Sequence, residues 1–156
     1  MDLQRRIAAR EGDFLLFALT PPRASTSAQE AQETADITVE RLRRLKIDGL
    51  ILYDIEDEPD RNGQERPFPF LPTMDPSDYL ERHLTALPTP VVIYRATAKY
   101  TESQLREWVQ SQDPETRLSV FVGASSRNAQ VGTTLRDAQR ISAEANPDLL
   151  LGAVAI

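Results

Sequence analysis

The side chains best suited to chemistry follow a short apolar segment near position 50. Gly49–Tyr53 has the length and composition of a buried strand. Acidic residues come directly after it, with Asp54 nearest to the strand end and Glu58 four residues further on. Carboxylates in such a loop can bind a hard cation or hold a polar substrate, although a solvated loop is the commoner structure for this composition. We predict that Asp54 and Glu58 bind substrate.

Two arginines accompany proline-rich segments on either side of this acidic stretch. Arg23 follows Pro21-Pro22 at the end of the first apolar run, where consecutive prolines must take the chain out of a sheet. Its guanidinium can meet a carboxylate or phosphate bidentately, or it can equally pair with the acidic loop. Arg66 precedes the run Pro-Phe-Pro-Phe-Leu-Pro at 67–72, which suits a ligand-stacking lid, a partner segment or simple packing across the site. We predict that Arg23 and Arg66 bind substrate.

Small, hydroxyl and aromatic residues lie at the ends of later apolar runs. The sequence Gly-Ala-Ser-Ser-Arg at 123–127 precedes a capped helix, which suits phosphate binding by Ser125 and Ser126, although an ordinary turn fits equally well. Tyr53 and Tyr94 each follow an apolar run, where a flat ring could rest against them. Tyrosines at strand ends also commonly keep the ring in the core and the hydroxyl in water.

The composition excludes several classes of function. The chain has no cysteine and a single histidine, His83, so it cannot form disulfides or thiolate sites, and we predict no metal centre. The net charge of -6 argues against nucleic-acid or anionic-membrane partners. No apolar run approaches the length of a membrane span and no leader precedes the first helix, so we expect a soluble, cytoplasmic protein. No catalytic residue is assigned.

Apolar runs and helical segments alternate along the whole chain. Helix starts are indicated at Ser27, Asp75, Thr101 and Thr134, after a short amphipathic helix within 2–11. Strand-like runs occupy 14–19, 49–53, 91–94, 118–122 and 149–156. Because these runs are apolar throughout, we predict an α/β fold with five parallel strands, four or five helices, and helices covering both faces of the sheet.

Two folds fit this order of elements. The first is a partial (β/α)8 barrel, since a whole one needs about 250 residues; residues 1–156 would then form a single domain equivalent to its N-terminal half. The alternative is a flavodoxin-like doubly wound sheet. In either case the last strand has no helix after it, so we expect exposed sheet edges that a homo-oligomer could cover.

Three stretches together resemble the methylenetetrahydrofolate reductase-like family of flavin-dependent barrels. Residues 17–23 (Phe-Ala-Leu-Thr-Pro-Pro-Arg) resemble the end of that family's first strand, and residues 48–70 resemble its Tyr-Asp…Asp-Glu…Arg-Pro-Phe-Pro-Phe pattern. Residues 122–125, and then 151–156 (Leu-Gly-Ala-Val-Ala-Ile), resemble later strands of the same barrel.

The resemblance implies a flavin-dependent oxidoreductase of one-carbon metabolism that uses FAD, NAD(P)H and a folate-type substrate. Tyr53, Tyr94, Ser125 and Ser126 would then bind the cofactor. The family carries a glutamate on the first strand, whereas this chain has Ala18, which cannot transfer a proton. The alternative is therefore a non-catalytic binding or interaction protein derived from such a barrel.

Overall fold

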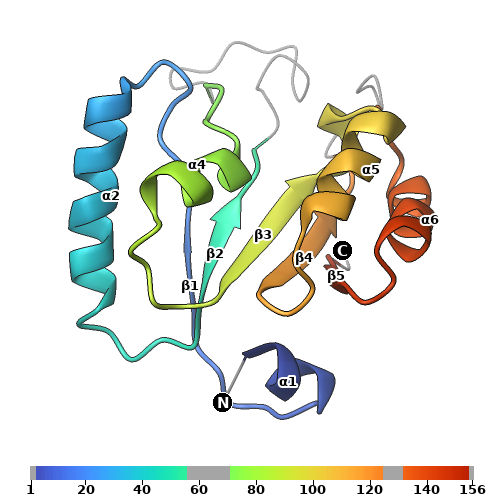
Figure 1. Ribbon diagram of the computed structural model, residues 1–156, viewed down its shortest axis with the longest axis horizontal. Helices are drawn as coiled ribbons and strands as arrows, with labels where there is room; N and C mark the ends of the chain where they lie inside the picture. Colours follow the sequence, from blue (N-terminus) through green and yellow to red (C-terminus); the bar gives the residue numbers. More distant parts are fainter. Residues whose placement is uncertain (1–2, 56–70, 125–131, 155–156) are drawn as a thin grey trace.

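The computed structural model describes residues 3–55, 71–124 and 132–154 (Figure 1). Helices and strands alternate through these ranges, and every strand pair is parallel, which confirms the predicted α/β class with five parallel strands. The elements are α1 (Leu3–Ala8), β1 (Leu16–Leu19), α2 (Ala28–Leu42), β2 (Gly49–Tyr53), α4 (Pro76–His83), β3 (Val91–Ala96), the 3-10 turn η1 (Thr97–Lys99), α5 (Glu102–Ser111), β4 (Arg117–Val122), α6 (Leu135–Ala145) and β5 (Leu150–Ala153).

The strands lie side by side in the order in which they occur along the chain, β1-β2-β3-β4-β5. A doubly wound sheet contains a point at which the strand order reverses, and the ligand binds there. A (β/α)8 barrel instead adds each strand next to the previous one. The observed order is therefore that of the partial barrel, and the sheet is open at β1 and β5.

Helices lie on both faces of the sheet, as predicted, but unequally: among the described residues four helices cover one face and α1 packs on the other. Helices α2, α4, α5 and α6 all contribute to one core on the same face of the sheet. Each right-handed crossover advances in the same direction, so each helix returns to the same side. The strand residues in this core include Leu50, Leu52, Ile93 and Phe121, all at most 1% exposed.

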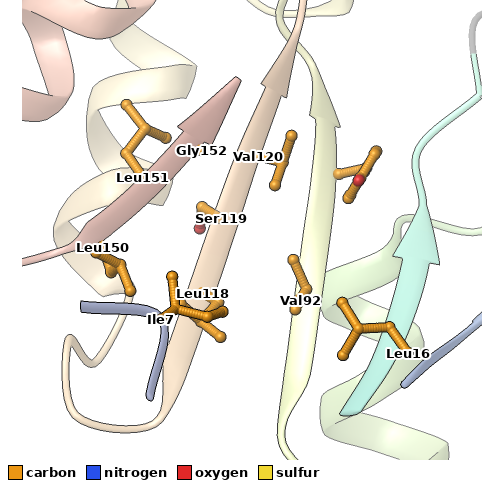
Figure 2. Close-up of a pocket in the computed structure, with 10 residues that line it drawn as sticks. Ile7, Leu16, Val92, Leu118, Ser119, Val120, Leu150, Leu151 and Gly152 are labelled. Carbon is orange, nitrogen blue, oxygen red and sulfur yellow. The ribbon is translucent and has the colours of Figure 1, made fainter. Parts of the chain in front are cut away.

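The opposite face, here called the inner face, carries a second and smaller cluster. Ile51, Val92, Leu118 and Leu150 lie in register across four strands, and α1 packs against them through Leu3. Beside α1 lies an apolar groove of about 160 Å³ (Figure 2). The next row of this face, toward the carboxyl ends of the strands, consists of Tyr53, Tyr94, Val120 and Gly152.

The helix starts follow from their capping residues. Ser27 and Thr101 form the predicted capping boxes with the residues three positions on. Asp75 accepts hydrogen bonds from two backbone N–H groups of α4, and Pro76 occupies the first helical position. These caps fix the point at which each connection from a strand end becomes a helix.

Several element boundaries differ from the sequence prediction: β3 extends to Ala96, β4 begins at Arg117 and β5 begins at Leu150. Strand β1 begins at Leu16, and Phe14 and Leu15 before it are exposed because neither has a neighbouring strand residue. Helix α4 ends at His83, although the buried Leu84 continues its apolar face as the C-cap residue. None of the helices in the described ranges has the length and hydrophobicity needed to cross a membrane.

Candidate functional site

Half of the predicted binding residues can be placed in the structure. Glu58, Arg66, Ser125 and Ser126 lie outside the described residues. Arg23, Tyr53, Asp54 and Tyr94 lie at or just beyond the carboxyl ends of β1, β2 and β3. Parallel α/β proteins bind ligands at this edge. The site is therefore described from these four residues and the side chains around them.

Tyr53 and Tyr94 are adjacent on the inner face. Their rings meet edge to face with centroids 5.0 Å apart, the geometry that the electrostatics of aromatic rings favour. Tyr53 is 37% exposed, while Tyr94 is partly buried and also lines the apolar groove. Burial and the neighbouring Tyr53 raise the pKa of the Tyr94 phenol, so it remains protonated at neutral pH. The pair forms an aromatic rim at the end of the groove.

Asp54 points to the other side of the sheet and is the centre of a buried polar network. Its side chain is only 1% exposed. One carboxylate oxygen accepts a hydrogen bond from Lys99 Nζ at 2.7 Å. The other accepts from Tyr100 Oη at 2.8 Å and from the backbone N–H of Ala96 at 3.2 Å. Three donors from the last residue of β3 and the turn after it thus converge on the residue that follows β2.

A second acid-base pair lies beside this network. Arg95 Nη1 donates to Asp75 Oδ2 at 2.5 Å, and the Arg95 side chain is only 6% exposed. The guanidinium carbon lies 3.9 Å from the centroid of the Tyr100 ring and 4.7 Å from that of Trp108, so two aromatic rings enclose it. Trp108 Nε1 in turn donates to Ser77 Oγ at 2.7 Å in α4.

The electrostatics of the two pairs are coupled through Tyr100. Its hydroxyl lies 2.8 Å from Asp54 and 3.4 Å from Asp75. Burial and the Asp54 carboxylate raise the pKa of Tyr100, which therefore stays a neutral donor. Burial raises the pKa of Asp75, but the charge and hydrogen bond of Arg95, with the backbone N–H groups of α4, outweigh it and lower that pKa overall. Two carboxylates and two basic side chains thus lie together in one compact cluster.

Arg23 is exposed at the end of β1 and belongs to a separate part of the edge. It forms an isolated antiparallel bridge with Thr73, flanked by hydrogen bonds from Ala24 N to Pro72 O and from Met74 N to Pro22 O, both 2.8 Å. Within the described ranges its guanidinium makes no ion pair or hydrogen bond. The structure thus places Arg23 on the connection to α2 and not with Tyr53 and Tyr94.

Sequence reasoning missed Lys99 and Tyr100. They lie at the end of η1 and just after it, but nothing in their spacing links them to Asp54, which lies about 45 residues earlier. The sequence shows only a Lys-Tyr pair shortly after β3 and an aspartate directly after β2. The pairing requires β2 and β3 to be adjacent and in register, with Tyr53 opposite Tyr94.

The arrangement is suited to binding. The inner face offers an apolar groove with an aromatic rim, which is complementary to a flat ring with polar edges. The carboxyl edge offers two acid-base pairs, Asp54 with Lys99 and Asp75 with Arg95. Among the described residues, no group of three histidine or acidic side chains is placed to hold a metal ion.

Comparison with known proteins finds similarity among solved structures. No family model matches the chain, and no curated protein matches it. Among solved structures, the chain is similar to an uncharacterized protein from Clostridium thermocellum that binds two copies of 5-methyl-5,6,7,8-tetrahydrofolic acid. The TM-score is 0.79 and the sequence identity is 36% over 98% of this chain. The match covers 48% of the other protein, so this chain spans about half of its length.

This match corrects two predictions made from the sequence. The similar protein is a folate binder with no sign of FAD, so the resemblance to the methylenetetrahydrofolate reductase-like flavin family is wrong, and so is the prediction of FAD as cofactor. The physical reason is that the quoted motifs mark a strand edge with aromatic and charged side chains. Such an edge suits any flat nitrogen heterocycle, so it cannot distinguish a pterin from a flavin. The comparison gives no support for NAD(P)H or for a homo-oligomer.

Proposed function

We propose that this chain binds a reduced folate at the carboxyl edge of its sheet. The observation that carries the proposal is the similarity to a protein that binds 5-methyltetrahydrofolate, which extends over 98% of this chain. The pterin ring would lie on the inner face against Tyr53 and Tyr94. The groove beyond Tyr94 would take apolar parts of the ligand.

The described residues support binding without implying a reaction. Ala18 is in register with Ile51 on the inner face, so the first strand presents a methyl group and no proton donor there. Asp54 is enclosed by its three donors and acts on a ligand only through them. The proposal is accordingly a binding protein, as in the alternative drawn from the sequence.

The direct test is calorimetric titration of the 156-residue chain with 5-methyltetrahydrofolate. Tyr53→Ala removes the exposed ring of the aromatic pair and should weaken binding about 10-fold, since stacking of a heterocycle on an aromatic side chain is worth about 1–3 kcal/mol. Tyr53→Phe keeps the ring and is the matched control, expected to bind nearly as the wild type does. Absence of binding by the wild-type chain at about 1 mM ligand, the limit of weak affinity, would refute the proposal.

A further inference from the structure

We propose that Lys99 is the cation that receives the carboxylate tail of the folate-type ligand, and that Asp54 is the positioning residue that holds it. The inference rests on the proposed function and assigns a residue to each end of the ligand. The pterin end meets the tyrosine pair, and the glutamate end meets Lys99. Lys99 was not among the residues predicted from the sequence.

The turn that carries Lys99 is fixed from several directions. Gly132 N donates to Ala98 O at 3.0 Å, and Thr133 Oγ1 donates to Tyr100 O at 2.7 Å. Thr97 Oγ1 donates to the carbonyl of Val122 at 3.3 Å, at the end of β4. A Cβ on Gly132 would lie 2.5 Å from Tyr100 O, so this contact requires glycine. The backbone around Lys99 is therefore held by the end of β4 and by the segment before α6.

The ammonium group of Lys99 is held just beyond the carboxyl end of β2. Lys99 Nζ donates to Asp54 Oδ1 at 2.7 Å and to the carbonyl of Ile55 at 2.9 Å. An ammonium carries three N–H donors, so one remains for a ligand. The Lys99 side chain is 27% exposed, in contrast to 1% for Asp54. Ile55 is two residues beyond Tyr53 in the chain, so the ammonium group and the aromatic rim both lie at the carboxyl end of β2.

A lysine held in this way is prepared for anion binding. A free lysine loses side-chain entropy when it is ordered by a ligand, and that cost is removed if another group has already ordered it. Asp54 orders Lys99 from the buried side and leaves its outer side open. Among the described residues, the other cations of this edge are less suitable: Arg95 is 6% exposed and committed to Asp75, and Arg23 lies on the connection to α2.

Two ligands, one with and one without the tail, distinguish binding at the pterin end from binding at the glutamate end. Binding is measured for 5-methyltetrahydrofolate and for 6-methyltetrahydropterin, which lacks the aminobenzoylglutamate tail. In the wild type the tail should strengthen binding. Lys99→Gln should reduce that advantage about 10-fold, as expected for loss of a charge-assisted hydrogen bond, and should leave the affinity for the tail-free pterin unchanged. Lys99→Arg should retain much of the affinity that the tail adds.

Lys46 is the matched control because it is the only other lysine in the chain. It is exposed in the connection between α2 and β2, at the opposite edge of the sheet. Lys46→Gln should change neither affinity. In the unmodified protein, acetic anhydride labelling followed by peptide mapping should show 5-methyltetrahydrofolate protecting Lys99 and not Lys46. This second measurement needs no variant and holds even if substitution of Lys99 disturbs the fold.

The outcomes distinguish this inference from the proposed function. If the wild type binds neither compound, folate binding itself is refuted. If it binds 5-methyltetrahydrofolate but Lys99→Gln weakens both ligands equally or neither, or if the ligand leaves Lys99 unprotected, the assignment of Lys99 is overturned. Loss of the tail advantage in Arg23→Gln, with Lys99→Gln unaffected, would overturn it as well.

Discussion

Replacing Asp54 with alanine should destabilise the fold by about 3 kcal/mol. Its carboxylate accepts hydrogen bonds from the Tyr100 hydroxyl at 2.8 Å and from the Ala96 N–H at 3.2 Å. Among the described residues, the other acceptor near the hydroxyl is Asp75, at 3.4 Å. Each buried donor left without a partner costs about 1–3 kcal/mol. Lys99 is 27% exposed and can turn to water, so it adds little. The orphaned Ala96 N–H and the Tyr100 hydroxyl, which keeps only its 3.4 Å contact with Asp75, contribute about 1.5 kcal/mol each and give the estimate.

Urea denaturation followed by circular dichroism measures this cost. Asp148→Ala is the matched control, because Asp148 is exposed in the turn before β5 and should tolerate the change without measurable loss. If Asp54→Ala costs no more than Asp148→Ala, Asp54 does not organise this edge of the sheet. The reasoning about Lys99 would then fail too, since nothing would hold its ammonium.

A double-mutant cycle with Tyr100→Phe tests the same network more closely. The Tyr100 hydroxyl should contribute about 1 kcal/mol in the wild type, where its acceptor lies at 2.8 Å. In the Asp54→Ala background the same substitution should cost almost nothing, because the phenol retains only the longer contact of 3.4 Å to Asp75. Strictly additive effects would mean that the two side chains do not interact.

Three further substitutions test the surroundings of the site. The pKa of Asp75 is lower in the folded than in the unfolded chain, so the unfolded chain takes up the proton first as the pH falls, and the free energy of unfolding should decline below about pH 4. Asp75→Asn keeps the helix cap but weakens the pair with Arg95. This variant should therefore show a flatter decline when unfolding is measured over an acid pH series. Gly132→Ala should lower the free energy of unfolding by about 1–3 kcal/mol, since its Cβ would overlap backbone oxygens; a neutral effect in urea denaturation would show that this segment does not pack on η1. Ser77→Ala should lower the free energy of unfolding by about 1–2 kcal/mol and alter the fluorescence emission of the single tryptophan, because Trp108 Nε1 loses its acceptor. Unchanged fluorescence would contradict the 2.7 Å contact between Trp108 and Ser77.

Local patterns along the chain predicted the elements well. Ser27 with Glu30 and Thr101 with Gln104 mark helix starts because a hydroxyl and a side-chain carbonyl satisfy the free N–H groups of the first turn, and these pairs are adjacent in sequence. The apolar run at β2 likewise indicates a strand buried on both sides. Such features depend on neighbours within a few residues, so they can be read without a fold.

The ligand class was predicted only in part. A folate-type ligand was implied by the family resemblance of three stretches, and the similarity to a folate-binding protein agrees with that part. FAD was predicted from the same motifs and was wrong. Aromatic and charged residues at a strand edge specify a flat, polar ligand but not its ring system, which depends on contacts across several strands.

The sequence alone determined the alternation of helices and strands, and it identified Asp54, Tyr53 and Tyr94 as residues at strand ends. Tertiary structure decided which side of the sheet each one faces: the tyrosines lie on the inner face, and Asp54 lies on the face covered by the helices. It also brought Lys99 to Asp54, across about 45 positions of sequence. The physical reason is that side-chain direction alternates along each strand while contacts depend on the register between strands, and that register is set by the packing of the whole sheet.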